Sequence, residues 1–284
     1  MTPAVLSIQS RVAYGHVGQG AAVLPLQRMG FEVLTLDTVQ LAHHPGHGGF
    51  VGRFEEPGPL EDMLEALERI GALKSCVGVL SGYLGTPAMA GLVEDALQRV
   101  RRLCPRAVYC CDPVIGDTHT GVFVRPGIEE AFRERLAPQA DLLVPNVFEL
   151  GRLSGVEIAG PDDALRAADR LRAQGASTVV ATGLPLADDP DRLAMLAVNQ
   201  EGAWLVTTAR HPAILHGTGD LFSALILGHR LRGRPWSDAL ATAAAAMAAL
   251  VERTIEEGGP ELALIPAQDD LLAPGAALPA VRLR

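Results

Sequence analysis

The sequence almost lacks lysine. Lys74 is the single lysine among 24 basic residues, and the other 23 are arginines. A phosphate-binding loop of the G-x-x-x-x-G-K-[ST] type needs a lysine in its glycine-rich stretch, and no glycine-rich stretch here contains one. The composition therefore excludes that class of nucleotide-binding loop. It also disfavours an enzyme that carries its cofactor as a lysine Schiff base.

Other features are scarce as well. The four cysteines form no C-x-x-C pair, so no disulfide or metal framework is indicated. The longest apolar stretch, residues 239–251, is too short to span a bilayer, and the N-terminus MTPAVLSIQS has no signal-peptide pattern. The net charge of −9 lacks the basic excess of a nucleic-acid surface. We expect a cytoplasmic protein with neither a nucleic-acid nor a membrane partner.

The residues that are present suit a globular enzyme. At 284 residues and 48% hydrophobic, the chain can bury a full core. Short apolar runs alternate with longer amphipathic ones that end at glycine or proline. The short runs predict strands at residues 5–8, 33–36, 77–80, 107–111, 142–144 and 178–181. The amphipathic runs predict helices at 21–29, 60–70, 89–103, 161–174, 220–231 and 236–255.

This alternation predicts one α/β domain over residues 1–284. We expect a three-layer αβα sandwich, in which helices flank a mostly parallel sheet. Residues 193–198 and 203–206 flank a turn and predict an antiparallel hairpin at the sheet edge. Ligands of such sheets bind beyond the carboxyl ends of the strands, so the residues that follow each strand are the candidates for function.

The segment Gly217-Thr218-Gly219-Asp220 precedes a long apolar helix. Its backbone N–H groups could bind an anion at the helix N-terminus, with Asp220 accepting a hydroxyl proton. The alternative is that Asp220 only complements the helix dipole, since aspartate is common in first turns.

Two further segments follow predicted strands. Asp112 and Asp117 could supply oxygen ligands to Mg²⁺, although Asp-Pro and Gly-Asp are also ordinary turn dipeptides. Asn146 and Glu149 have the spacing of a helix capping box.

A histidine-rich segment contains His43, His44, Pro45 and His47. It could suggest a metal site, but no helix is expected to hold it and we expect no cysteine or carboxylate close by. A glycine-rich substrate loop is the favoured interpretation over a zinc site.

Together these motifs resemble the pyridoxal kinases of the ribokinase-like superfamily over essentially the whole chain. The matching strings are IQSRVAYGHVG at 8–18, LSGYLG at 80–85, CDPVIGD at 111–117, PNVFE at 145–149 and GTGD at 217–220. GTGD-like ends occur across the superfamily, whereas the opening string and LSGYLG are specific to the vitamin B6 branch.

The resemblance implies ATP-dependent phosphorylation of the 5′-hydroxyl of pyridoxal by a homodimer without a separate lid domain, with pyridoxine and pyridoxamine as further candidate acceptors. It implies Asp220 as the base, and Gly217, Thr218 and Gly219 as the phosphoryl-binding amides. The residues implied to contact the vitamer are Ser10, Val17, Val39, His44, Pro45, Tyr83 and Asp220. Those on the ATP side are Asp112, Asn146, Glu149, Thr182 and the residues 217–219. Asp112, Asp117 and Glu149 are implied to hold Mg²⁺, with a monovalent cation (K⁺ or Na⁺) nearby.

The sequence departs from this pattern at three positions. Pro45 replaces a threonine whose hydroxyl contacts substrate, Gln19 stands where asparagine is frequent, and Val144 replaces a frequent threonine near the monovalent-cation site. Two other functions therefore stay open. One is a sibling kinase that acts on hydroxymethylpyrimidine or a sugar, and the other is a non-catalytic B6-binding protein.

Overall fold

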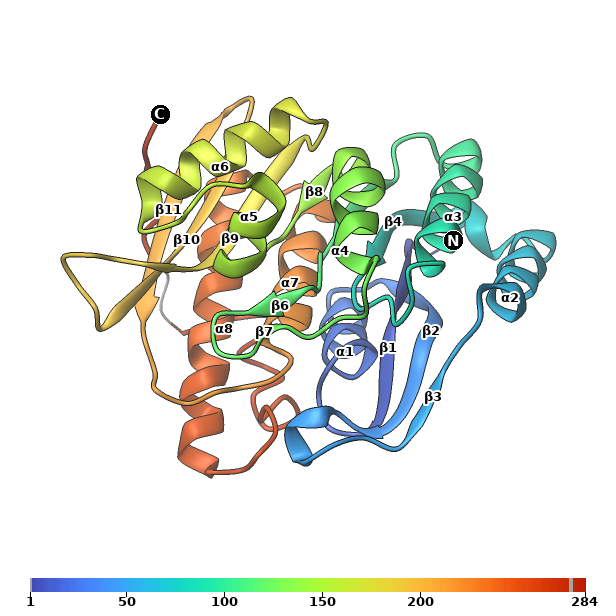
Figure 1. Cartoon of the computed structure of the whole chain (residues 1–284), viewed down its shortest axis with the longest axis horizontal. Helices are drawn as coiled ribbons and strands as arrows, with labels where there is room; N and C mark the ends of the chain where they lie inside the picture. Colours follow the sequence, from blue (N-terminus) through green and yellow to red (C-terminus); the bar gives the residue numbers. More distant parts are fainter. Residues whose placement is uncertain (1, 276–277) are drawn as a thin grey trace.

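The computed structural model describes residues 2–275 and 278–284 and contains a central sheet of ten strands (Figure 1). Its order is β12-β11-β10-β9-β8-β5-β4-β1-β2-β3. The parallel strands are β1 (Ala4–Tyr14), β2 (Glu32–His43), β4 (Cys76–Ser81), β5 (Val108–Cys111), β8 (Leu142–Leu143) and β9 (Thr178–Pro185). The antiparallel strands are β3 (Gly52–Phe54), β10 (Arg192–Asn199), β11 (Gly202–Ala209) and β12 (Val281–Arg282). The predicted parallel core is confirmed.

The strands are apolar on both faces because helices cover both faces of the sheet. In β1, Leu6 and Ile8 pack into one hydrophobic cluster and Val5 packs into the other, and all three side chains are fully buried. This double burial explains why the strand segments are continuously apolar.

Two helix layers complete the predicted three-layer sandwich. One face is covered by α1 (Gln19–Arg28), α7 (Thr218–Leu231) and α8 (Trp236–Glu257). The other is covered by α2 (Pro57–Arg69), α3 (Met89–Leu103), α4 (Ile128–Ala131), α5 (Val147–Ser154) and α6 (Pro161–Ala173). Figure 1 shows α5 and α6 in front of the sheet and α7 and α8 behind it. No helix in the described ranges combines the length and the hydropathy that crossing a membrane requires.

The hairpin prediction is confirmed for its strands but wrong about the edge. β10 and β11 pair antiparallel as expected, yet β12 pairs with β11 and covers it. Because β12 has only two residues, no run of apolar residues predicted this pairing. The sequence also gave no signal for β3 or for the small separate hairpin of β6 (Gly116–Asp117) and β7 (Gly121–Val122). Within the described residues, that two-stranded hairpin is the only sheet besides the main one.

Candidate functional site

The N-terminus of α7 lies against the turn between β1 and α1. Gly217 is the N-cap residue and has a φ of 85°, a left-handed conformation that favours glycine. A Cβ atom at this position would lie 1.8 Å from the carbonyl oxygen of His16, so no side chain fits. A Cβ at Gly219 would meet no atom within 4 Å, so the first turn is open on that side. The amides of Gly217, Thr218 and Gly219 are therefore available to an anion at the helix N-terminus.

Asp220 occupies the first turn of α7, at the place that the sequence predicts. Burial raises the pKa of Asp220 to about 6, although a backbone hydrogen bond from Gly18 opposes the shift. A carboxyl group with this pKa can accept a proton near neutral pH. The position thus combines a base with adjacent anion-binding amides.

A second buried carboxylate faces α7. Asp112 follows β5 and is 4% exposed, and its Oδ2 accepts a hydrogen bond of 2.9 Å from the Ser223 hydroxyl, one turn beyond Asp220. Burial, followed by the carboxylates of Glu149 and Asp220, raises the pKa of Asp112 well above its ordinary value. These acidic groups therefore influence one another electrostatically inside a poorly solvated site.

Glu149 belongs to the capping box that the sequence predicts. Its backbone N–H donates to the side chain of Asn146, and its Oε2 accepts the Asn146 N–H at 2.9 Å. Its Oε1 accepts the N–H of Ile115 at 3.0 Å, so Glu149 also fixes the loop after β5. Burial nevertheless raises the pKa of Glu149 to about 8, against the hydrogen bonds from the Ile115, Asn146 and Gly116 backbones.

The donor set at this edge fits a hard divalent cation. Asp112 and Glu149 offer buried carboxylate oxygens, and Mg²⁺ takes oxygen ligands. Asp117 differs, because its Oδ1 accepts the N–H groups of His119 and Thr120 at 2.8 and 2.7 Å. Burial would raise the pKa of Asp117, but these hydrogen bonds outweigh it and lower the pKa. The structure thus explains Asp117 as a turn residue, and its role as a metal ligand stays a prediction.

Asn146 and Thr182 lie side by side at the same edge of the sheet. A parallel bridge joins them, and the Thr182 N–H donates to the Pro145 carbonyl oxygen at 3.0 Å. The Asn146 amide group donates to the Gly116 carbonyl oxygen at 2.8 Å. The structure therefore brings both residues to the strand ends, while their contact with a nucleotide stays a prediction.

The residues predicted to contact a substrate ring come from β1, β2 and the loop after β4. Ser10 is 8% exposed, and Gly18 approaches it so closely that a Cβ would lie 2.4 Å from the Ser10 hydroxyl. Val39 is fully buried, and the Thr38 hydroxyl donates to the Tyr83 carbonyl oxygen at 2.6 Å. Val17, on the turn that leads into α1, is half-buried. The structure thus places Ser10 against the turn before α1 and Val39 in the core next to the segment that bonds Tyr83, and the contact of these residues with a substrate ring stays a prediction.

The histidine-rich loop corrects the sequence analysis. His44 is buried and caps a short 3₁₀ helix, Pro45–His47, whereas Pro45 itself is exposed. Contrary to expectation, a carboxylate lies close by, because Glu261 contacts both His44 and His47. Glu261 follows α8 and is separated from His44 by 217 positions, so no sequence spacing could reveal it.

The hydrogen bonds of two further residues were not predicted from the sequence. Ser223 gave no signal because it lies within an apolar helical run. Gln19 is 1% exposed and accepts a hydrogen bond from the Ser7 hydroxyl at 2.8 Å. Its amide group donates to the carbonyl oxygens of Ser7 and Leu36 at 3.0 and 3.4 Å. Gln19 therefore joins α1 to β1 and β2 beneath the site.

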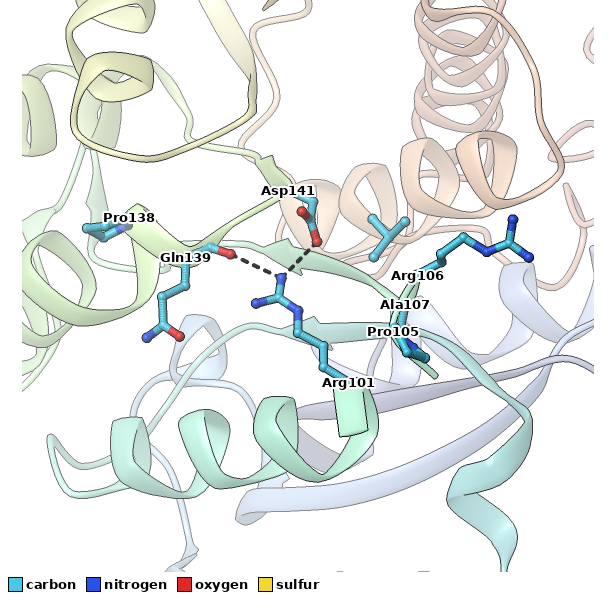
Figure 2. Close-up of a pocket in the computed structure, with 8 residues that line it drawn as sticks. Arg101, Pro105, Arg106, Ala107, Pro138, Gln139 and Asp141 are labelled. Atoms are coloured by element: carbon cyan, nitrogen blue, oxygen red, sulfur yellow. Dashed lines mark hydrogen bonds and ion pairs between the residues drawn. The ribbon is translucent and has the colours of Figure 1, made fainter. Parts of the chain in front are cut away.

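A surface hollow of about 640 Å³ lies at the opposite edge of the sheet (Figure 2). Its lining includes Val108, at the start of β5, and Asp141, which precedes β8. Arg101 donates to Asp141 at 2.9 Å and to the Gln139 carbonyl oxygen at 3.3 Å (Figure 2). Because the hollow lies at the amino ends of these strands and its polar groups pair with one another, it is separate from the candidate site.

The chain is similar to known proteins over nearly its whole length. The family model of phosphomethylpyrimidine kinase matches residues 65–262. A curated pyridoxal kinase PdxY of Rubrobacter xylanophilus is 44% identical over 281 residues, which cover 98% of this chain and 97% of that protein. The PdxY of Deinococcus radiodurans is 42% identical, with 95% and 93% covered. The solved pyridoxal kinase of Leishmania donovani with ADP and pyridoxamine superposes with a TM-score of 0.92 at 31% identity, and 99% of each chain is covered.

Proposed function

This chain belongs to the pyridoxal kinase family, and from that premise we propose that it phosphorylates the 5′-hydroxyl of pyridoxal with ATP. The product is pyridoxal 5′-phosphate. The Leishmania relatives bound to ADP with pyridoxamine or pyridoxine extend the proposal to those vitamers. Phosphoryl transfer depends mainly on positioning and charge stabilisation, and the N-terminus of α7 offers both.

One observation carries the proposal, namely the position of Asp220 directly after the Gly217–Gly219 amides. The vitamer hydroxyl transfers its proton to the Asp220 carboxylate while its oxygen attacks the terminal phosphorus of ATP. The bond between that phosphorus and the bridging oxygen breaks, and ADP leaves. The N–H groups of residues 217–219 stabilise the negative charge on the phosphoryl oxygens. The Ser10 side chain hydrogen-bonds the pyridine ring, and Val17, Val39 and Tyr83 pack around it.

Asp112 and Glu149 would hold Mg²⁺, with Asn146 and Thr182 beside the nucleotide. Bound Mg²⁺ would neutralise phosphate charge. The mutual electrostatic effects of Asp112, Glu149 and Asp220 support a cation at this place. We extend the proposal to a monovalent cation, K⁺ or Na⁺, near Val144.

The decisive experiment is the substitution Asp220→Asn, which keeps the shape of the side chain and removes the base. We expect turnover with ATP and pyridoxal to fall at least about a hundredfold. Turnover is measured as the rate at which the phosphorylated product forms. Asp238→Asn is the matched control, since Asp238 also lies in a first helical turn, that of α8, but is exposed and outside the site. Unchanged turnover in Asp220→Asn would contradict the assignment.

A second candidate substrate is hydroxymethylpyrimidine, and the match to the phosphomethylpyrimidine kinase model favours it over a sugar. The same assay with pyridoxal, hydroxymethylpyrimidine and ribose as competing acceptors separates these possibilities. A non-catalytic B6-binding protein would bind the vitamer without consuming ATP. We expect pyridoxal to be the best acceptor.

We also propose that residues 1–284 form one domain that works as a homodimer in the cytoplasm. One ten-stranded sheet that spans the described chain supports the single domain. Exposed apolar side chains near β1, β2 and β3 support self-association, namely those of Tyr14, Phe50 and Val51. The four free thiols suit a reducing compartment. Light scattering of the purified protein tests the dimer.

A further inference from the structure

The carboxylate of Glu261 joins two loops at the vitamer end of the site. Its Oε2 accepts the backbone N–H of His16 at 2.8 Å, in the turn between β1 and α1. Its Oε1 accepts hydrogen bonds from Nε2 of His44 at 2.7 Å and from Nε2 of His47 at 2.6 Å. The Glu261 side chain is only 11% exposed, so water competes weakly for these contacts. One side chain from the segment after α8 thus holds both loops.

The histidine loop also contacts the residue that precedes the phosphoryl-binding turn. The rings of His44 and His216 lie 4.6 Å apart, centre to centre. A Cβ at Gly46 would lie 2.5 Å from Nε2 of His216, so the loop backbone approaches this ring closely. His216 directly precedes Gly217, whose own position depends on the close carbonyl group of His16. Glu261 therefore contacts the vitamer loop directly, whereas it approaches the anion-binding amides only through His16 and the loop.

The backbone at Gly15 also lies close to the Glu261 carboxylate. A Cβ at Gly15, where φ is 111°, would lie 2.6 Å from Oε2 of Glu261. Burial alone would raise the pKa of Glu261, but the hydrogen bonds from His16, His47 and His44 outweigh it and lower the pKa. Glu261 is therefore ionised at neutral pH and accepts charge-assisted hydrogen bonds, which are stronger than neutral ones.

A metal ion is the obvious rival, because His44, His47 and Glu261 have ligand atoms within 4.8 Å of one another. The backbone N–H of Gly46 donates to Nδ1 of His44 at 3.2 Å, which requires that nitrogen to lack a proton. In the neutral ring the proton is then on Nε2, where it is donated to Glu261. A metal on Nε2 would move the proton to Nδ1, against the Gly46 N–H. The hydrogen-bonded arrangement is thus favoured over the metal site.

We propose that Glu261 is a positioning residue for the vitamer, which keeps the His44–His47 loop closed over the substrate site through its hydrogen bonds to both imidazoles. This inference rests on the proposed function for its substrate. Glu261 itself does not touch the reacting atoms, so it acts on vitamer affinity through the loop.

The test compares Glu261→Gln with Glu256→Gln. Glutamine has one acceptor oxygen and one amide NH₂ group, so it cannot accept hydrogen bonds both from the imidazoles and from the His16 N–H. Glu256 is the matched control, because it lies near the end of α8, is exposed and pairs with Arg253 at 3.6 Å. For each variant, KM for pyridoxal, KM for ATP and kcat are measured with Mg²⁺. Hydrogen exchange of the amides of residues 46–49 is measured in the free protein after treatment with EDTA.

In Glu261→Gln we expect KM for pyridoxal to rise about tenfold, because a loop that is closed for a smaller fraction of the time weakens binding in proportion. KM for ATP should stay within about twofold, and the amides of residues 46–49 should exchange at least about tenfold faster. Glu256→Gln should match the wild type in every readout. Because His47 acts through the same carboxylate, the double variant Glu261→Gln/His47→Ala should raise KM for pyridoxal no more than Glu261→Gln alone.

Three results would overturn the proposal. The first is an unchanged KM for pyridoxal with unchanged loop exchange in Glu261→Gln, and the second is an equal rise in KM for ATP. The third is EDTA-treated wild type whose loop exchanges as fast as Glu261→Gln and becomes protected on addition of Zn²⁺, which would assign the loop to a metal ion. If the wild type phosphorylates no vitamer, the proposed function fails, while the exchange comparison still decides whether Glu261 closes the loop.

Discussion

Gly217 offers the sharpest test of how the anion-binding turn is built. In Gly217→Ala, the new Cβ would lie 1.8 Å from the His16 carbonyl oxygen, and it would be held at a φ of 85°. The left-handed conformation costs a residue with a Cβ about 1–2 kcal/mol. Relief of the overlap needs a backbone shift, for which overpacking sets a scale of about 1–3 kcal/mol. We expect the free energy of unfolding to fall by about 3 kcal/mol and turnover to fall at least about a hundredfold, since the shift displaces the amides themselves.

Gly219→Ala is the control for this substitution, because Gly219 lies in the same turn but its Cβ would meet no atom within 4 Å. Alanine is a better helix former than glycine, so the free energy of unfolding should stay equal or rise by up to about 1 kcal/mol. Thermal unfolding followed by circular dichroism measures both variants. For a chain of this size, about 3 kcal/mol corresponds to a fall in Tm of roughly 6–12 °C. A Gly217→Ala protein with the Tm and the turnover of the wild type would refute the close approach between residues 16 and 217.

Two other substitutions test buried groups. His229 is 1% exposed, neither of its ring nitrogens has a hydrogen-bond partner among the described residues, and burial lowers its pKa from 6.5 to about 4. As pH falls, the unfolded chain binds the proton at a higher pH than the folded chain does. The free energy of unfolding of the wild type should therefore fall by up to about 3 kcal/mol between pH 6.5 and 4. Urea unfolding should show no such fall in His229→Leu. Asp112→Asn keeps a partner for the Ser223 hydroxyl and removes a buried charge. In EDTA it should raise the free energy of unfolding by about 1 kcal/mol, while turnover with Mg²⁺ falls at least about tenfold; a destabilised or fully active variant would contradict this reasoning.

The parallel core could be predicted because its signal is local. Each strand is buried on both faces, and each helix ends at residues that stop helices, so periodicity and composition are enough. The predicted helix 89–103 coincides with α3, Met89–Leu103. β12 and the β6–β7 hairpin could not be predicted in this way. β12 has two residues and pairs with a strand distant in the sequence, as when Val281 pairs with Leu205. The β6–β7 hairpin is local, but each of its strands has two residues, which is too short for a periodic pattern.

The same distinction applies to the site. Asp112, Asn146 and Asp220 could be placed near one another because parallel strands bring their carboxyl ends to one edge, and each of these residues follows a strand or begins a helix. Their proximity follows from the general geometry of a parallel sheet and does not depend on which residues surround each of them. Ser223 escaped prediction for the opposite reason. Its hydroxyl faces Asp112 only because α7 packs on the face of the sheet behind β5, and nothing in an apolar helical run marks that contact.

The contact between Glu261 and the loop that follows His44 could be predicted only in part from the sequence. Glycines in the loop that follows His44 increase the entropy that is lost when the loop closes, so a closed loop needs compensating contacts. The loop residue Pro45 supplies no hydroxyl, and the residues that follow it are exposed up to Phe50. The compensation must therefore come from outside the loop, and the only side chains of the loop that can donate hydrogen bonds are its histidines. A largely shielded acceptor opposite His44 and His47 satisfies that requirement, and Glu261 is that acceptor. The sequence thus implies that the loop needs a partner, while only the fold identifies which residue it is.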